Sequence, residues 1–323
     1  MPSKTKAYLA LIYIAIIWGT TYLAIRVCVE HYPPFLFAAV RQVISAAIIL
    51  TLGYAVSKEV DLSAKNLKQQ ALVGFLLITL GNGLVSWSEK YVTSGVAALI
   101  CSMMPISTVI INLITVKGEK LNLQILLGLF LGFAGVALIF RDNLSELANP
   151  SYLLGIGCLL VATSSWAYGS ILNKRRPNKI NPVFNSGLQL LFGGIFLFIG
   201  SPFIDSYDNL VLWQPEAFWS LIYLIIFGSV IAYTAYMYAL KELPVGLVSI
   251  YAYINPLVAV ILGYFLKDEP LTWFTALSFT VIMLGVFLVN SGYRKQHKTS
   301  GIKDLGDNEI TALPQPQSSY SKN

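Results

Sequence analysis

Polar side chains recur at helical spacing inside several apolar stretches of this chain. Asn82, Ser86 and Glu89 form one such stripe, because steps of four and then three residues return to the same face of a helix. The other stripes are Ser229, Tyr233 and Tyr236; Ser249, Tyr253 and Pro256; and Ala98, Ser102 and Pro105. A polar stripe on an apolar helix turns toward protein or water. We therefore expect the stripes to line a cavity, with hydrogen bonding between helices as the alternative for any single Ser or Thr.

Aromatic residues add a possible wall to this cavity. Trp18 and Trp166 lie well inside apolar stretches, near the middle of the helices expected there. That position disfavours a place in the aromatic belt at a membrane interface. It suits a flat wall against an apolar or aromatic ligand, and plain packing explains the two tryptophans equally well. We include Trp18, Tyr22 and Trp166 among the predicted cavity residues.

Arg41 is a cation inside an apolar stretch, seven residues beyond Pro34. At 1.5 Å per residue this places it roughly 10 Å into a membrane. Its side chain is expected to extend outward to the surface or to bond backbone carbonyls. The functional alternative is an anchor for a substrate carboxylate, or a gate partner for Glu89. Glu89 is also the nearest candidate for a buried carboxylate that couples proton movement to transport.

The chain offers little for catalysis or metal binding. Its two histidines are His31 and His297, and it contains no HExxH motif and no GxxxxGK[ST] loop. Cys28, Cys101 and Cys158 have no spacing typical of a metal site or a disulfide framework. We expect no cofactor, no metal and no ATP, and we keep a membrane-embedded enzyme only as a remote alternative.

The elements that carry these residues are predicted to be membrane-spanning helices. The chain of 323 residues is 56% hydrophobic and only 12% charged, against about 25% charged residues in soluble domains. The apolar residues form blocks close to the roughly 20 residues that cross a bilayer as a helix. The predicted spans are 7–27, 34–57, 70–89, 93–115, 122–140, 152–173, 181–203, 217–239, 244–266 and 271–291.

Lys and Arg residues predict the orientation of these spans. With a cytoplasmic N-terminus, most of the 22 Lys and Arg residues fall on the cytoplasmic side. Both termini are therefore expected in the cytoplasm. The net charge of +6 is a topology signal, so the expected partners are the lipid bilayer and a small-molecule substrate, without nucleic acid. The polar segment 292–323 is predicted to be a disordered tail.

The two halves of the chain repeat each other. Pro105 and Pro256 are separated by 151 residues, and Arg41 and Gln189 by 148. We assign the first repeat to 1–145 and the second to 146–291. Five spans per repeat invert the second half in the membrane, as in secondary transporters whose substrate site lies between the halves. The prolines are expected to bend their helices, and Gln189 is expected to keep the position opposite Arg41 polar.

The chain resembles the EamA family of the drug/metabolite transporter superfamily over about residues 7–291. In the first half the segments that carry the resemblance are WGTTYLAIR at 18–26, PPFLFAAVRQ at 33–42, GNGLVSWSEK at 81–90, SGVAALICSMMP at 94–105 and GEKL at 118–121. In the second half they are SWAYGSILNK at 165–174, FGSVIAYTAYMYALK at 227–241, VSIYAYINP at 248–256 and KDEPLT at 267–272. The resemblance implies a ten-helix basket with a central cavity, and export of small metabolites or drugs across the inner membrane.

Two questions stay open at this level. Amino acids or their analogues are the first expectation for the substrate, because one cation amid aromatic residues can hold a carboxylate. The alternative is a carrier of the same fold for phosphorylated or nucleotide-linked substrates, which would call for several cavity cations. The glycines of a GxxxG pattern, Gly128 and Gly132, favour close packing within the chain over a dimer seam, so both monomer and homodimer remain possible.

Overall fold

The computed structural model describes residues 3–115, 122–142, 149–175, 181–208, 210, 213–243, 245–249, 251–268 and 271–299. Over these residues the regular structure is helical, with no strand. The helices of the first half are α1 Ser3–Val29, α2 Pro34–Val56, α3 Ala64–Gly74, η1 Phe75–Gly83, α4 Leu84–Ser88, α5 Ser94–Cys101, α6 Met104–Thr115 and α7 Leu123–Asp142. Those of the second half are α8 Pro150–Arg175, α9 Pro182–Ile204, α10 Pro215–Tyr223, η3 Leu224–Ile231, α11 Ala232–Glu242, α12 Val245–Val248, α13 Tyr251–Lys267 and α14 Trp273–Thr299.

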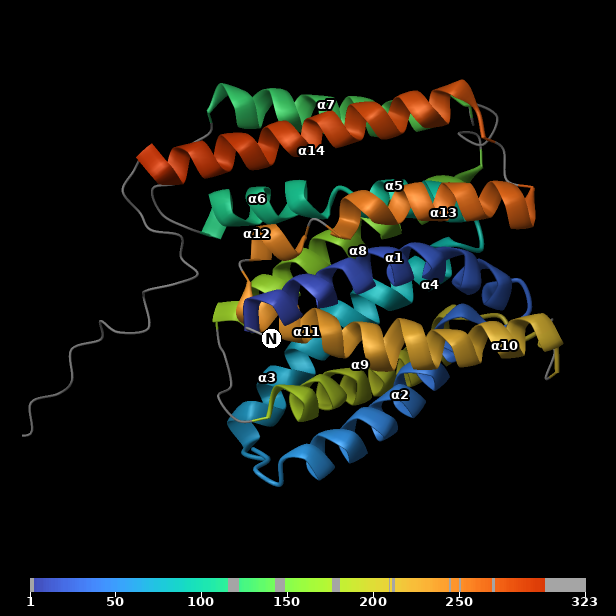
Figure 1. The fold of residues 1–323 in the computed structure, drawn as a ribbon. Helices are drawn as coiled ribbons and strands as arrows, with labels where there is room; N and C mark the ends of the chain where they lie inside the picture. Colours follow the sequence, from blue (N-terminus) through green and yellow to red (C-terminus); the bar gives the residue numbers. More distant parts are fainter. Residues whose placement is uncertain are drawn as a thin grey trace, which may run out of the picture.

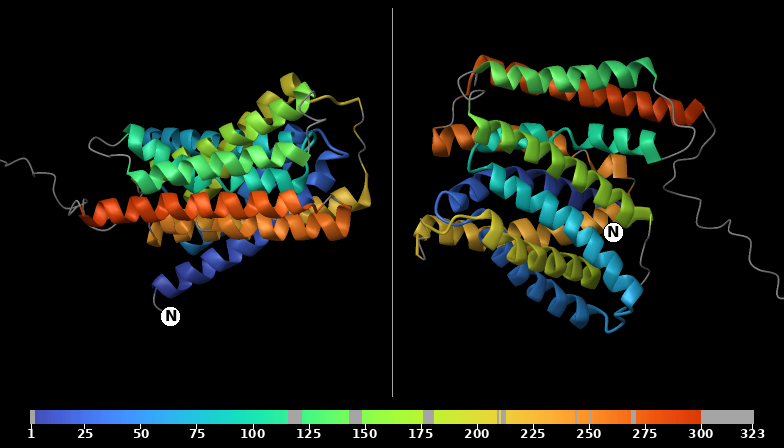
Figure 2. Two further views of the ribbon diagram at one scale, coloured as in Figure 1. Left: turned by 90° about the horizontal axis from the view of Figure 1, so that it is seen from above. Right: turned by 180° about the vertical axis from the view of Figure 1, so that it is seen from behind.

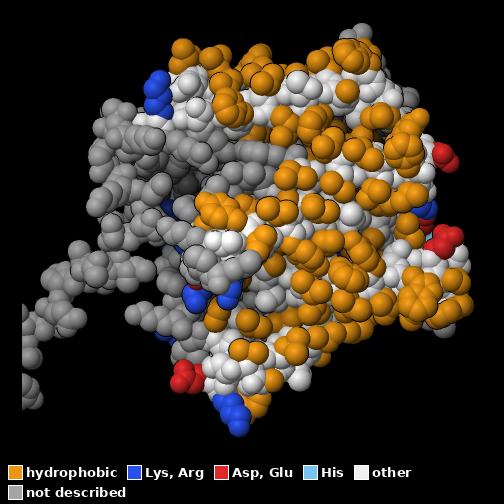
Figure 3. All heavy atoms as spheres, viewed as in Figure 1, with side chains coloured by type: hydrophobic (Ala, Val, Ile, Leu, Met, Phe, Trp, Pro, Cys, Tyr) orange, Lys and Arg blue, Asp and Glu red, His pale blue; other side chains and the backbone are white. Residues whose placement is uncertain are grey.

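Seven helical stretches are long and apolar enough to cross a membrane. They are Thr5–Val29, Pro34–Val56, Ala64–Ser88, Ser94–Thr115, Pro150–Arg175, Pro182–Ile204 and Pro215–Glu242. The other three predicted spans overlap shorter apolar helices at Leu123–Gly135, Ile254–Lys267 and Trp273–Val289. In Figure 3, hydrophobic side chains cover much of the described part of the visible face, and the charged side chains of the described residues lie toward its two ends.

Local sequence signals explain where several helices begin. The side chain of Ser63 accepts a hydrogen bond from the backbone N–H of Asn66 at the start of α3. Thr93 and Asn181 cap α5 and α9 in the same way. Proline in the first turn, where its missing N–H has no helical partner to lose, starts α2, α9 and α10.

The helices run side by side, and two pairs form opposite edges of the bundle. α7 lies along α14 at one edge, and α2 lies along α9 at the other (Figures 1 and 2). Between them stand α1 and α8, which pack against α13, α11, η1 and α6. Residues 30–33 lie at one end of the bundle, which we call the Arg26 end. The opposite end holds residues 57–63 and the end of α8, and we call it the Lys174 end.

Glycines make the contact between α7 and α14 close. A Cβ atom added at Gly285 would lie 2.6 Å from the backbone N of Gly132 and 2.7 Å from the backbone O of Gly128. Gly135 likewise approaches the backbone of Ser278 and Ile282. The GxxxG pattern therefore packs within the chain, as the sequence favoured.

Four stretches depart from a regular α-helix. The third and eighth predicted spans contain the π-helical segments η1 and η3, at matching places in the two halves. The fourth span is interrupted at residues 102–103, and Pro105 stands in the first turn of the helix that follows. In the ninth span α12 ends at Val248, Ser249 is in a turn, and Pro256 lies inside α13, which begins at Tyr251. A bend at Pro256 itself stays a prediction.

The predicted start of the disordered tail, at residue 292, is wrong. α14 continues to Thr299, so residues 292–299 are helical instead of disordered. The Asn122 side chain donates a hydrogen bond to the backbone O of Gly292 (2.9 Å), which fixes the helix at that point. Adding residues to an existing helix is easy compared with starting one, so the polar residues that follow can continue it. Residues 300–323 lie outside the described part of the chain.

Candidate functional site

A cavity lies between the two halves of the bundle. Its walls come from α1, α2, η1, α4, α5 and α6 of the first half and from α8, α9, η3, α11 and α13 of the second. The volume open to the centre of a water-sized sphere is about 90 Å³. One water needs about 10–15 Å³ on this measure, so the cavity has room for several waters or one small ligand.

The structure brings seven of the predicted site residues to this cavity. Its lining includes Trp18, Tyr22, Arg41, Asn82, Ser102, Trp166 and Tyr233. Tyr236, Gln189 and Ser86 are buried outside the described lining, as are Glu89, Pro105 and Pro256. The side chain of Tyr253 lies outside the described part of the structure. Whether any of these residues contacts a substrate stays a prediction.

The aromatic residues form one contiguous cluster at the cavity wall. The rings of Trp18 and Trp166 meet edge to face, with centroids 5.5 Å apart. Trp18 also contacts Tyr251 at 4.9 Å and Tyr236 at 5.1 Å. Trp18 Nε1 donates to the backbone O of Gly228 (3.0 Å), and Trp166 Nε1 donates to Tyr236 Oη (3.2 Å). Both indole N–H groups are therefore satisfied within the protein, which leaves the rings to serve as an apolar surface.

Arg41 lies in the cavity wall and does not extend to the protein surface. Its side chain is 3% exposed, so the interpretation of an outward-reaching arginine is wrong. Nε donates to Ser229 Oγ (2.9 Å), and Nη1 approaches Asn82 Oδ1 (3.5 Å). Gln42 Nε2 also donates to Asn82 Oδ1 (3.1 Å), and Ser229 Oγ donates to Gln42 Oε1 (3.4 Å). Polar side chains from α2, η1 and η3 thus hold the guanidinium at the cavity.

Gln189 belongs to a chain of amides on the Lys174 side of the cavity. Tyr233 Oη donates to Gln189 Oε1 (2.7 Å). Gln189 Nε2 donates to Gln70 Oε1 (2.6 Å) and to Asn173 Oδ1 (3.0 Å). The chain continues through Gln70 Nε2 to Asn66 Oδ1 (2.8 Å). Tyr233 therefore connects the cavity to buried and half-buried amides that join α3, α8 and α9.

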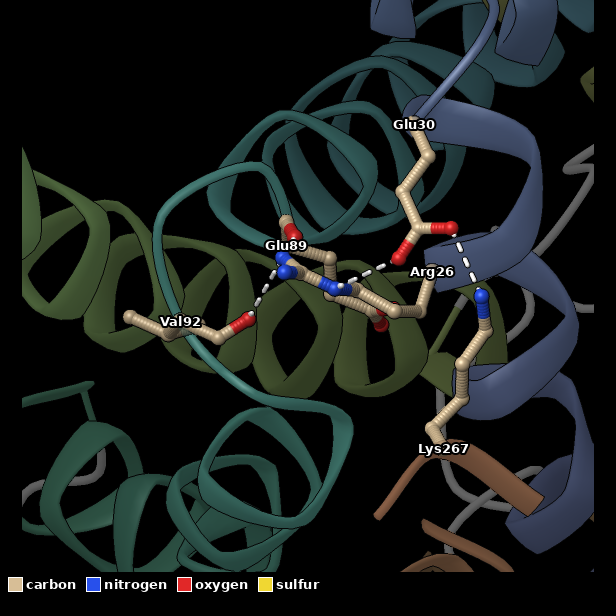
Figure 4. Close-up of polar contacts among 5 residues, drawn as sticks. All are labelled: Arg26, Glu30, Glu89, Val92 and Lys267. Atoms are coloured by element: carbon tan, nitrogen blue, oxygen red, sulfur yellow. Dashed lines mark hydrogen bonds and ion pairs between the residues drawn. The ribbon is translucent and has the colours of Figure 1, made fainter. Parts of the chain in front are cut away.

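Charged side chains link the helices at the Arg26 end. Arg26 Nη1 donates to the backbone O of Glu89 and to that of Val92 (3.4 Å for the latter), as Figure 4 shows. Glu30 pairs with Arg26 Nε (3.5 Å) and with Lys267 Nζ (2.7 Å). These contacts join α1 to the end of α4 and to the end of α13. The Glu89 side chain beside them is fully buried.

The Lys174 end carries a related contact. Lys174, which aligns with Arg26 in the repeat, donates from Nζ to the backbone O of Lys241 (2.9 Å). In each half a basic residue near the end of the first helix therefore binds a backbone carbonyl near the end of the third span. The two contacts lie at opposite ends of the bundle.

Several lining residues were not singled out from the sequence. They are Thr21, Gln42, Thr163, Tyr251 and Asn255. Gln42 had a usable signal, because it follows Arg41 directly in an apolar helix and carries the same demand for polar neighbours. Ser86 shows the reverse case. Its hydroxyl donates to the backbone O of Asn82 (3.0 Å), and so it satisfies itself within its own helix.

Known proteins resemble this chain over nearly its whole length. An inner membrane transporter of Escherichia coli K12, YedA, described as uncharacterized, is 36% identical over 287 residues, which cover 88% of this chain and 90% of YedA. The uncharacterized transporter YvbV of Bacillus subtilis is 26% identical, with 96% of this chain and 98% of YvbV covered. YoaV of the same organism, also an uncharacterized transporter, is 24% identical over 88% of this chain and 96% of its own.

The fold and the sequence profile agree with these similarities. A known crystal structure superposes with a TM-score of 0.63 at 18% identity, covering 90% of this chain and 99% of that one. The profile of the EamA-like transporter family matches twice, at residues 5–141 and 153–291. The chain is therefore a multi-pass membrane protein, and it belongs to the EamA-like transporter family.

Proposed function

We propose that this protein is a secondary transporter that exports small organic molecules by alternating access. The observation that carries the proposal is the cavity between the two halves, which joins a buried guanidinium to an aromatic wall. Such a site offers one polar anchor and a surface for an apolar body. Membership of a transporter family is also consistent with the expected absence of enzymatic activity.

The packing of the helices supports a fold of ten spans in two inverted repeats. Under the repeat, α1 corresponds to α8, α2 to α9 and α7 to α14. α2 packs on α9 and α7 on α14, so each of these helices meets its own counterpart. α1 packs on α11 and α13, and α8 packs on α4 and α6, which are the counterparts of those partners. Exchange of the halves therefore maps the main contacts onto one another, as a pseudo-two-fold axis requires.

The contacts at the two ends support alternating access. Arg26, Glu30 and Lys267, which we call the Arg26 group, join three helices at one end. Lys174 and the amide chain of Gln189, which we call the Lys174 group, join helices at the other end. Each set consists of a few polar bonds that can break without unpacking a hydrophobic core. We assign the Arg26 group to the outer gate and the Lys174 group to the inner gate.

The cavity favours a substrate with few charges. Amino acids and their analogues are the first class to test, with Arg41 as the anchor of a carboxylate. The alternative, a phosphorylated or nucleotide-linked substrate, is less well served, because Arg41 is the one Lys or Arg among the described lining residues. Drugs with an apolar body fit the aromatic wall.

The orientation follows from charge and from a relative. YedA is described as an inner membrane transporter, and we place this chain in the inner membrane as well. The excess of Lys and Arg on one side supports a topology in which both termini lie in the cytoplasm. The Arg26 end then faces outward. Glu89, buried near that end, is our candidate for proton coupling.

Flux from proteoliposomes tests the proposal. Vesicles loaded with amino acids, nucleobases and cationic dyes are assayed with and without a pH gradient, for the natural chain and for Glu89→Gln. If the protein couples export to protons through Glu89, a gradient accelerates flux and the substitution abolishes that acceleration. Glu59→Gln, which changes an exposed carboxylate outside the bundle, serves as the matched control.

The other outcomes are equally informative. Protein-dependent flux that ignores the gradient in all three samples identifies a facilitator and gives Glu89 a structural role. No flux above empty vesicles, even after phosphorylated sugars and organic monocarboxylates are added to the pool, contradicts the transporter proposal for this chain.

A further inference from the structure

The charges around the cavity narrow the class of substrate. Arg41 is the one charged side chain among the described residues that line it, and no Asp or Glu occurs in that lining. Glu89 is fully buried and is not one of the described lining residues. The described lining therefore presents one positive charge and no carboxylate to a ligand, and Glu89 lies behind it, close enough to interact electrostatically with Arg41.

The guanidinium keeps bonding capacity for a ligand. It has five N–H donors, and Ser229 and Asn82 account for Nε and for one N–H of Nη1. Nη2 lies near Gly228, where an added Cβ would approach it to 3.2 Å. A side chain at Gly228 would press on this edge of the guanidinium, and both residues line the cavity. A carboxylate is the group that matches such a fork with two parallel hydrogen bonds.

Among the described lining residues, an ammonium group finds no comparable partner. The neutral oxygens of Thr21, Ser102 and Thr163 can accept from it, and the faces of Trp18 and Tyr251 can attract it weakly. The same groups would serve an uncharged ligand as well. The charge of Arg41 repels an ammonium group held a few ångströms from it, which removes part of that gain.

We infer that the cavity selects organic monocarboxylates that have a flat apolar body and no free ammonium group. This inference rests on the proposed function and makes its substrate class more specific. It ranks a deaminated or N-blocked amino acid above the zwitterionic amino acid itself. Dicarboxylates rank lower, because the second negative charge finds no cation among the described lining residues.

A series of compounds with one benzyl body tests the ranking. The probe is radiolabelled 3-phenylpropanoate, bound at equilibrium to the full chain in lipid nanodiscs. The competitors are phenylalanine, its amide, 3-phenylpropanamide and benzylmalonate, which are respectively a zwitterion, a cation, a neutral molecule and a dianion. We expect each to compete at least about tenfold more weakly than unlabelled 3-phenylpropanoate, because each lacks the single charge-assisted bond or adds an unmatched charge.

Substitution of Arg41 tests whether this residue causes the preference for carboxylates. Arg41→Gln is expected to remove the preference for the acid over 3-phenylpropanamide, whereas Arg41→Lys keeps part of it. Lys58→Gln, which removes an exposed cation from the loop after α2, should leave the ranking unchanged. The ranking on the natural chain stands as a test even if a substitution at Arg41 prevents folding.

Two results would overturn the inference. One is binding of phenylalanine or of 3-phenylpropanamide as tight as that of 3-phenylpropanoate. The other is no binding of the probe at millimolar concentration by a chain that exports other compounds, which leaves the proposed function intact. A chain that binds the probe as ranked but moves nothing supports the binding class and contradicts the proposed function.

Discussion

Asn82 holds the Arg41 side chain at the cavity without neutralising its charge. Its Oδ1 accepts from Gln42 Nε2 and lies 3.5 Å from Arg41 Nη1, so it holds two side chains of α2 at the cavity. An amide does this without neutralising the guanidinium. The charge is thereby left available to a ligand, while its donors are partly satisfied.

Replacing this amide by a carboxylate should keep the stability of the protein while weakening its binding of carboxylate substrates. In Asn82→Asp the new carboxylate sits beside Arg41 as an internal counter-ion, so we expect a melting temperature equal to or a few degrees above that of the natural chain. Carboxylate flux should fall by about tenfold or more, because the substrate no longer meets an uncompensated cation.

Asn82→Ala provides the comparison. It removes the acceptor from Gln42 and Arg41 without supplying charge, and should lower stability by about 1–3 kcal/mol. Melting temperatures and flux are measured on the same preparations. If Asn82→Asp transports carboxylates as fast as the natural chain, Arg41 is not their anchor.

At the scale of helices, the seam between α7 and α14 depends on the absence of side chains. A Cβ at Gly285 would overlap backbone atoms of α7, which cannot move aside as the tip of a side chain can. We expect Gly285→Ala to force the two helices apart and to destabilise the protein by about 1–3 kcal/mol in thermal unfolding.

Gly157 offers a matched control in α8. Nothing lies within 4 Å of a Cβ added there, so Gly157→Ala should be neutral, or more stable by up to about 1 kcal/mol from helix propensity. Equal melting temperatures for the two variants would show that α7 and α14 are not held in close contact.

The ion pairs of the Arg26 group are expected to restrain opening of the cavity at the Arg26 end. Glu30 holds Arg26 on its own helix and Lys267 on α13, and Glu30→Gln weakens both pairs. The pairs are partly exposed, so each is worth about 0.2–1 kcal/mol. We expect a two- to fivefold rise, roughly, in the opening equilibrium.

Cys101 reports this opening because it lines the cavity. With Cys28 and Cys158 replaced by Ser, its labelling by a maleimide added at the Arg26 end should be faster in Glu30→Gln. Glu59→Gln, at the opposite end, should leave the rate unchanged. An unchanged rate in Glu30→Gln would indicate that the pairs do not restrain opening.

For the whole molecule, the inverted repeat predicts sidedness. A fluorescent protein that folds only in the cytoplasm should glow when fused after residue 57 or at the C-terminus, since even numbers of proposed spans precede those points. Fused after Asp142, behind five spans, it should remain dark, and a periplasmic phosphatase reporter there should be active. A bright Asp142 fusion would rule out the proposed number of spans in the first half.

Much of this architecture was accessible from the sequence. Apolar blocks gave the helices, and stripes at helical spacing led to Asn82, Ser102 and Tyr233, which line the cavity. The proximity of Arg41 to Ser229 could not be read from spacing, because the two are 188 residues apart and meet only through tertiary packing. The π-helical segments have no clear sequence signature. α14 extends past the end of its apolar block, because a helix can continue beyond the membrane.

The pairing of α7 with α14 has a consequence for biosynthesis. α7 ends at Asp142, and its partner begins at Trp273, so roughly 130 residues of chain separate the two. While the second half is being made, the glycine surface of α7 has no partner helix of its own chain against it. α14 thus completes the packing of α7 only after the rest of the second half has been made, and a nascent chain stopped before Trp273 would leave that surface to lipid or to quality control.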